Sequence, residues 1–140
     1  MYLLDTNVLS AARKAEEPVR AWLEAERTAP MYLSVVTIGE IERGIENIGR
    51  RDGAKARVLG QWLQRLLIEY SDRILPVDLQ TGRAWGRITA GPTAPLADAL
   101  IAATAKVHDL VVVTRNVRDY ERFMPIGIVN PWDRDTWVRA

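Results

Sequence analysis

The stretch that decides the fold class is Met1-Tyr2-Leu3-Leu4-Asp5-Thr6-Asn7, at the start of the 140-residue chain. Its first four residues are an apolar run, which predicts a short buried strand over 1–4. Asp5-Thr6-Asn7 is a turn-forming cluster, so the strand is expected to end at Asp5. Outward from this stretch, similar apolar runs predict further strands over 31–36, 73–77, 110–114 and 126–129.

Helical patterns separate these strands. Helices are predicted, in chain order, after Asn7, from Pro18, over 38–48, over 54–70, around Trp85 to Ile88, over 96–108, and between the last two strands. Thr37 is expected to cap the third of these, with Glu40 completing a capping box. Strands that alternate with helices favour a parallel sheet covered on both faces. We therefore expect one domain over 1–140, a three-layer α/β/α sandwich around a mostly parallel sheet of four to five strands.

The composition excludes several classes of function. There is no cysteine, which rules out disulfides and thiolate zinc sites, and His108 is the only histidine, which argues against a Ser-His-Asp hydrolase. The first residues lack the basic and long apolar regions of a signal peptide, and no apolar run approaches the ~20 residues of a membrane span. We expect a soluble, cytoplasmic protein with no membrane partner. The net charge of +1 leaves nucleic acid binding open.

Carboxylates are the main candidates for chemistry. Asp5 and Glu40 are both expected just past the carboxyl end of a strand, and Asp98 is expected in the first turn of the helix that leads into strand 110–114. Parallel strands bring their carboxyl ends to one edge of a sheet, so these side chains should converge there with the segment 114–119. Taken singly, each carboxylate has another interpretation, as a helix cap or a partner of the helix dipole. Converging carboxylates repel one another unless a cation binds between them.

All-oxygen sites of this kind select Mg²⁺, for which Mn²⁺ substitutes. The predicted metal ligands are Asp5, Glu40 and Asp98, and the further catalytic candidates are Asn116 and Asp119. This donor set is typical of phosphodiester hydrolysis in which a carboxylate orients the attacking water. Neutral groups at Thr6, Asn7 and Thr114 are expected to hold the ligands by hydrogen bonds, although turn and cap roles explain the same residues.

Four arginines are candidates for contact with substrate phosphates. Arg83 and Arg87 lie four residues apart on one predicted helix, while Arg115 and Arg118 follow strand 110–114 near the acidic edge. Ordinary surface charge explains these arginines equally well.

Four motifs together resemble the PIN-domain family, and within it the VapC-type toxins of toxin–antitoxin pairs. The matching segments, in order, are Leu3 to Asn7, Ser34 to Ile41, Asp98 to Ala105 and Val113 to Tyr120, with Asn130-Pro131-Trp132 resembling one branch of the family. Order and spacing match over essentially the whole chain. A lone Asp-Thr-Asn would be a weak signal, whereas four motifs in sequence are a strong one.

The resemblance implies an Mg²⁺-dependent endoribonuclease toxin, held inactive by a cognate VapB-type antitoxin, dimeric, and part of a larger hetero-oligomer with that antitoxin. Asp5, Glu40 and Asp98 carry over as the acidic triad. The sequence departs from the family at Asn116, where many members have Asp, and Asp119 is a candidate for the missing charge. One Mg²⁺ is therefore expected rather than two. The alternative function is a PIN-like module that binds RNA or protein without cleaving it.

Overall fold

The computed structural model describes residues 1–91 and 93–139 of the chain. Its strands and helices follow the predicted order and end in a short 3₁₀ helix. The elements are β1 (Tyr2–Leu4), α1 (Thr6–Arg13), α2 (Glu17–Ala25), β2 (Met31–Ser34), α3 (Val35–Gly49), α4 (Gly53–Glu69), β3 (Ile74–Leu75), α5 (Leu79–Ile88), α6 (Leu96–His108), β4 (Val111–Val113), α7 (Val117–Glu121), β5 (Ile128–Val129) and η1 (Arg134–Arg139). The helix predicted over 96–108 has those same bounds.

The five strands form one parallel sheet in the order β3-β2-β1-β4-β5. β1 lies at the centre, with Tyr2 paired to Met31 of β2 on one side and to Val111 of β4 on the other. Because all strands run the same way, their carboxyl ends share one edge of the sheet. At this edge β1 leads into Asp5, and the amide of Thr114 donates to the carbonyl of Val129.

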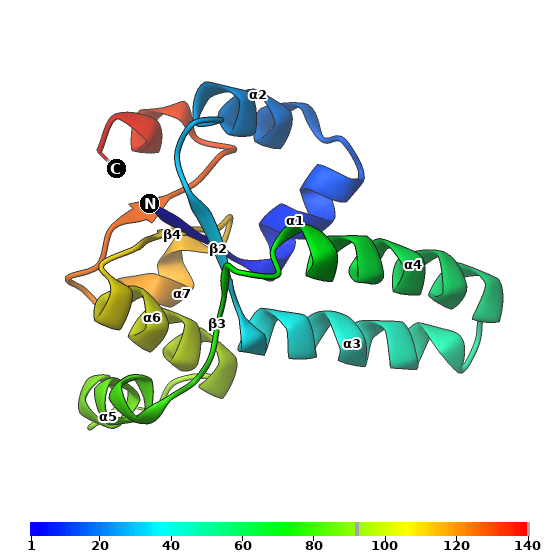
Figure 1. Cartoon of the computed structure of the whole chain (residues 1–140). Coiled ribbons are helices and arrows are strands. Elements are labelled where there is room, and N and C mark those ends of the chain that lie inside the picture. The colour runs from blue at the N-terminus through cyan, green and yellow to red at the C-terminus, as the bar shows by residue number, and fades with distance from the viewer. Residues whose placement is uncertain (92, 140) are drawn as a thin grey trace.

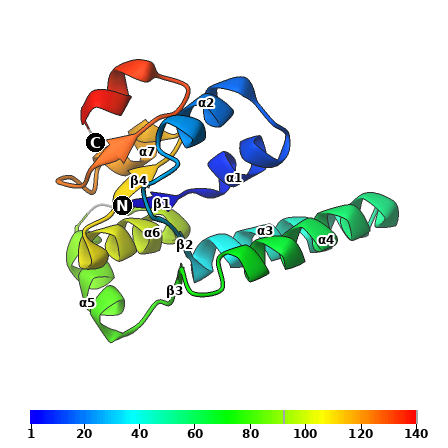
Figure 2. The same cartoon turned by 45° about the horizontal axis from the view of Figure 1, so that its top comes forward.

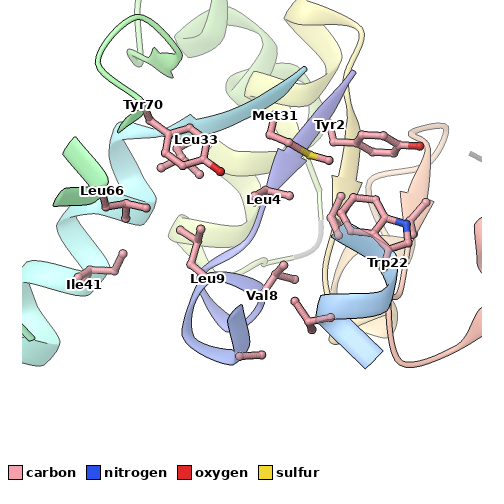
Figure 3. Packing of buried hydrophobic residues seen from close by; sticks show 14 of the residues in the cluster. Tyr2, Leu4, Val8, Leu9, Trp22, Met31, Leu33, Ile41, Leu66 and Tyr70 are labelled. Atoms are coloured by element: carbon pink, nitrogen blue, oxygen red, sulfur yellow. The ribbon is translucent and has the colours of Figure 1, made fainter. Parts of the chain in front are cut away.

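Helices cover both faces of the sheet (Figures 1 and 2). On one face, side chains from α1 to α4 pack on the strands (Figure 3). At one end of this cluster the fully buried Trp22 ring lies edge-on to Tyr2, with 4.9 Å between the ring centroids. On the other face, α6 and α7 pack on β1 and β4, and α5 packs against α6. Small side chains such as Ala99 and Ala102 let α6 lie close to the sheet. The predicted three-layer α/β/α architecture is confirmed.

Helices α3 and α4 form a hairpin that extends away from the sheet (Figures 1 and 2). Its inner side is apolar and includes Ile41, Ile45 and Leu59. A groove of about 270 Å³ runs between this hairpin and α1, with Glu40 at one end and Trp62 and Lys55 among its walls. The hairpin therefore adds a concave surface that begins at the acidic edge.

Local predictions around β2 and α3 need correction. The strand predicted over 31–36 ends at Ser34, whose hydroxyl accepts from the amide of Val36 at 3.0 Å and caps α3. The capping box of Thr37 and Glu40 is therefore wrong, because Thr37 lies inside the helix, fully buried, and its hydroxyl has no hydrogen-bond partner among the described residues.

The outer strands are shorter than predicted. The strand expected over 73–77 covers only Ile74–Leu75, and the one over 126–129 covers only Ile128–Val129. Both lie at the edges of the sheet, where one side of each has no strand to pair with. The sequence also predicts a loop over 91–95, between α5 and α6, and Pro92 of that segment lies outside the described residues.

Within the described ranges, none of the helices combines the length and the apolar character that a membrane crossing requires.

Candidate active site

Asp5 is the most firmly held residue of the acidic edge. Its backbone amide donates to the Val113 carbonyl at 2.9 Å, which joins the end of β1 to β4. Its side chain caps α1, with Oδ1 accepting from the amide of Thr6 at 2.8 Å. The residue is only 6% exposed. Capping and burial together fix the direction of this carboxylate.

The second oxygen of Asp5 accepts three side-chain hydrogen bonds. Oδ2 receives the hydroxyl of Thr114 at 2.8 Å, the hydroxyl of Tyr120 at 3.3 Å and the amide of Asn7 at 3.3 Å. Donors of this kind replace the water that a buried carboxylate has lost. They also leave Asp5 little freedom to turn.

Thr114 and Asn7 link the ends of β1 and β4. The Thr114 hydroxyl accepts from the Asn7 side chain at 3.2 Å and from the Asn116 amide at 3.0 Å. The carbonyl oxygen of the Asn7 side chain accepts from the backbone amide of Arg115 at 3.0 Å. The two neutral residues therefore support Asp5 and shape the loop that follows β4.

Glu40 reaches the same site from α3. The sequence predicts Glu40 just past the end of a strand. In the structure it lies on the second turn of α3, because this helix begins directly after Ser34. Thr6 connects it to the site: the Thr6 hydroxyl donates to Glu40 Oε1 at 2.7 Å. Thr6 thus contacts both carboxylates, Asp5 through its amide and Glu40 through its hydroxyl.

Asp98 approaches from the opposite face of the sheet, in the first turn of α6. Its pKa is raised to about 6, first by burial and then by the negative charges of Asp5, Asp119 and Glu40, while Arg122 lowers it. A carboxylate whose pKa is raised by three others lies near all of them. The structure therefore brings together four of the five predicted catalytic residues.

Asn116 is the fifth, and it occupies the N-cap of α7. Its side chain is exposed and makes no capping hydrogen bond, which leaves the amide oxygen available to a ligand. Asp119 lies in the first turn of the same helix, close enough to Asp98 to affect its pKa. Asn116 and Asp119 thus present one neutral and one charged oxygen donor to the site.

The donor set fits a hydrated magnesium ion. Within the described residues, no three carboxylate or histidine side chains stand close enough to enclose an ion by themselves. Mg²⁺ does not need such an enclosure, because it keeps several waters and binds through one or two carboxylates. Asp5 and Asp98, with Glu40 beside them, supply only oxygen atoms and an excess of negative charge.

The candidate arginines divide into two groups. Arg115 follows Thr114 at the rim of the site, and Arg118 is exposed on α7. Arg83 and Arg87 lie on α5, where Arg87 lines a hollow with Lys106, at the end of α6 away from Asp98. The structure therefore places Arg115 and Arg118 near the acidic edge but not Arg87.

Two residues of the site were missed from the sequence. Tyr120 is fully buried, donates its hydroxyl to Asp5, and has its pKa raised by burial and by the charges of Asp5 and Asp98. Arg122 is the cation that affects Asp98. In the sequence, an aromatic residue in a short helix indicates core packing. No local pattern shows that the hydroxyl of Tyr120 donates to Asp5, which is 115 positions away.

Comparison with known proteins agrees with this geometry. The family model of the PIN domain matches residues 2–123, which includes every acidic residue of the site. The chain belongs to the PIN domain family.

Three relatives extend the match to nearly the full chain. VapC ribonuclease Y4jK of Sinorhizobium fredii is 35% identical over 143 residues, covering 95% of this chain and 99% of that protein. Toxin FitB of Neisseria gonorrhoeae is 34% identical over 94% of this chain and 99% of its own length, and the crystal structure of FitAcB superimposes with a TM-score of 0.83. A toxin-antitoxin complex from Klebsiella pneumoniae is 25% identical, with a TM-score of 0.70 over 95% of this chain and 99% of that one.

Proposed function

We propose that this PIN domain is an Mg²⁺-dependent endoribonuclease toxin of the cytoplasm, neutralised by a cognate antitoxin. One observation carries the proposal: four carboxylates lie near one another at the carboxyl edge of the sheet, where burial and the charges of the other three raise the pKa of Asp98 to about 6. A site built only to fold would gain nothing from this repulsion, whereas a cation relieves it. The printed names of the relatives, a VapC ribonuclease and a toxin, agree with the same activity.

Each acidic residue has a role that its surroundings support. Asp5, at the end of β1, and Asp98, at the start of α6, would hold the metal ion. Glu40, positioned by the Thr6 hydroxyl, would accept a proton from the attacking water or hold that water in line. Mg²⁺, when bound, supplies polarisation of the phosphate and lowers the pKa of water.

The loop after β4 completes the site. Asn116 cannot act as a base, but its exposed amide is suited to hold water or a phosphate oxygen. Asp119 supplies a further charge near Asp98. Because Asp119 is the carboxylate of this segment whose charge acts on Asp98, and Asn116 is neutral, we propose one magnesium ion rather than two.

The proposed partner is a VapB-type antitoxin. The groove between α1 and the α3–α4 hairpin has apolar walls, a rim of Arg13, Lys14 and Lys55, and Glu40 at its inner end. A helical or extended antitoxin segment would bury its apolar residues in this groove. An arginine of that segment would then reach Glu40 and the carboxylates behind it, in the place of the metal ion and the RNA.

Assembly is part of the same proposal. Apolar side chains are exposed around α5 and the start of α6, where Leu79 is 75% and Leu96 is 61% exposed. Exposed apolar groups of this size are often covered by association. We propose a homodimer that binds antitoxin to form a larger hetero-oligomer.

The direct test is cleavage of single-stranded RNA. Wild-type protein is expected to cut the RNA with Mg²⁺ or Mn²⁺, and chelation with EDTA should abolish cutting. Asp98→Asn should lower the rate by about 10³-fold, since it removes charge at the metal position. The matched control is Asp72→Asn, a carboxylate whose side chain is 85% exposed beside Arg73, which should leave the rate unchanged.

The alternative is a PIN-like module that binds RNA or protein without cleaving it. Equal survival of the RNA with wild-type protein, with Asp98→Asn and with EDTA would favour that alternative. A short open reading frame that overlaps or precedes this gene, whose product stops cleavage by the purified protein, would support the antitoxin part of the proposal.

A further inference from the structure

A tryptophan beyond β5 lies beside the acidic edge. Trp132 belongs to the turn that leads from β5 into η1, and its ring packs against the core on the α1 and α2 face. Figures 1 and 2 show this C-terminal segment returning beside α2.

The turn that carries Trp132 is closed by several hydrogen bonds. The side chain of Asn130 accepts from the Trp132 amide at 3.0 Å, and the Asn130 amide donates to the Thr136 hydroxyl at 2.8 Å. The indole of Trp137 donates to the Asn130 carbonyl at 3.3 Å, and Pro131 is buried. The ring of Trp132 is therefore held on a firm base rather than on a loose tail.

The guanidinium of Arg115 lies over this ring, 4.8 Å from its centroid. Stacking takes up the flat face of a guanidinium and leaves the N–H groups at its edge free to bind an anion. Arg115 is exposed, and within the described residues the ion pairs involve other arginines, so no carboxylate holds its charge.

Hydrogen bonds connect Arg115 to the acidic site. Its backbone amide donates to Asn7 Oδ1 at 3.0 Å, and Asn7 in turn donates to Asp5 Oδ2 at 3.3 Å. The backbone of Arg115 is therefore at a fixed place on the rim of the site, and the stack on Trp132 fixes the guanidinium. A strand of RNA that delivers one phosphate to the cluster carries its neighbouring phosphates past this rim.

We infer that Trp132 is a positioning residue for RNA binding: it holds the guanidinium of Arg115 where it binds a phosphate next to the one that is cut. Because Arg115 covers the ring face, Trp132 acts through the arginine rather than by stacking on a base. This inference rests on the proposed function for its substrate, single-stranded RNA.

The chain contains a matched control pair. Arg134 lies over Trp137 at 4.6 Å, in the same C-terminal segment and in the same kind of stack. No described hydrogen bond joins Arg134 to Asn7 or Asp5. If any stacked arginine sufficed for RNA binding, the two pairs would contribute equally.

The test measures binding of a short single-stranded RNA in an Asp98→Asn background, where the RNA is expected to stay intact. Arg115→Gln should weaken binding about tenfold, and the slope of log K against log salt should fall by about 0.7, the value for one lost phosphate contact on a single strand. Trp132→Leu should weaken binding by about fivefold through loss of the stack. Arg134→Gln should bind like the parent.

The double variant distinguishes positioning from an independent contact. Trp132→Leu combined with Arg115→Gln should bind no more weakly than Arg115→Gln alone, because the ring acts only through the arginine. Trp132→Phe, which keeps an aromatic face, should bind within about twofold of the parent. In cleavage assays with Asp98 restored, Arg115→Gln should raise KM and leave kcat within about twofold, which is the pattern of lost uniform binding.

The outcomes separate this inference from the proposed function. Additive effects of Trp132→Leu and Arg115→Gln, or a loss in Arg134→Gln equal to that in Arg115→Gln, would overturn it. If Trp132→Leu does not fold, Arg115→Lys serves instead, since lysine keeps the charge but loses the planar stack. If Arg115→Lys binds RNA as tightly as the parent, the inference is overturned. If wild-type protein cuts no RNA, the proposed nuclease fails, while the binding measurements still decide the role of Arg115.

Discussion

Asp5 and Asp98 lie near each other at the carboxyl edge of the sheet, with the same charge and opposite surroundings. Asp5 is buried at the end of β1 and accepts four hydrogen bonds, from one backbone amide and three side chains. Asp98 lies half-buried at the start of α6, accepts no hydrogen bond from any described residue, and has its pKa raised by burial and by three other carboxylates.

These surroundings suit two requirements of the proposed metal site. A metal ligand must point in one direction before the ion arrives, and the protein's own donors hold Asp5 in this way. A cation site must also carry charge that is not yet neutralised, and Asp98, which lies near three other carboxylates, would provide it. In the proposed site, Asp5 is thus held in place by the protein, while the charge of Asp98 would be neutralised by the cation.

The largest effects are expected when the same substitution is made at both residues. Asp5→Asn should lower the free energy of unfolding by about 2–3 kcal/mol. The substitution replaces one carboxylate oxygen by an amide nitrogen, which cannot accept a hydrogen bond from the donors that face it. Asp98→Asn should raise it by about 1 kcal/mol without metal, since it removes a repelled charge that solvent partly screens. Urea unfolding at pH 7.5 with EDTA measures both values. Changes of the same sign would mean that the two surroundings do not differ as described.

The second prediction concerns the hydroxyl that supports Asp5. Thr114→Val should cost about 2 kcal/mol of stability, because Asp5, Asn7 and the Asn116 amide each lose a partner. Thr37→Val is the matched control: that hydroxyl is equally buried but has no partner, so its loss should be neutral or stabilising. Thermal unfolding of the two variants compares them directly, and equal losses would show that the network around Asp5 adds nothing.

The third prediction is a pH dependence of Asp98→Asn. The pKa of Asp98 is raised from the ordinary value of 3.8 to about 6 in the folded protein. At a pH between these two values, the folded state keeps a proton on Asp98 that the unfolded state has released. Stability of the wild type from this group therefore falls as pH rises from about 4 to 6 and stays lower above 6. The advantage of Asp98→Asn should be absent at pH 4, grow to about 1 kcal/mol by pH 7, and shrink again when Mg²⁺ is added. A pH-independent advantage would point to a cause other than charge.

The smallest effect is expected at Tyr120. Tyr120→Phe removes one of three side-chain donors to Asp5 Oδ2, at 3.3 Å, and keeps the buried ring. We expect a loss of about 1 kcal/mol in stability and of a few-fold in cleavage, with KM for RNA unchanged. Steady-state kinetics beside thermal unfolding measures this, and an effect as large as that of Thr114→Val would mean that the phenol is the main support of Asp5.

Much of the architecture could be predicted because its signals are local. The alternation of apolar runs with helical spacing led to the parallel sheet, and the Ala-rich segment 96–108 led to α6 with its observed bounds. The start of α3 could not be predicted in the same way. Ser34 and Thr37 are both good caps, three residues apart, and the choice depends on where β2 stops pairing with β3.

The sequence alone predicts which side chains stand where the elements meet the edge of the sheet: Asp5 after β1, Asp98 at the start of α6, and the neutral Asn116 after β4. These positions follow from residue type and spacing along the chain. Their environments depend on the tertiary structure. Tyr120, Thr114 and Asn7 come to Asp5 from distant segments, while Asp98 meets other carboxylates and Arg122, and Arg115 meets Trp132. Hydrogen bonds and electrostatic interactions depend on distance in space, which the packing of the sheet and its helices sets.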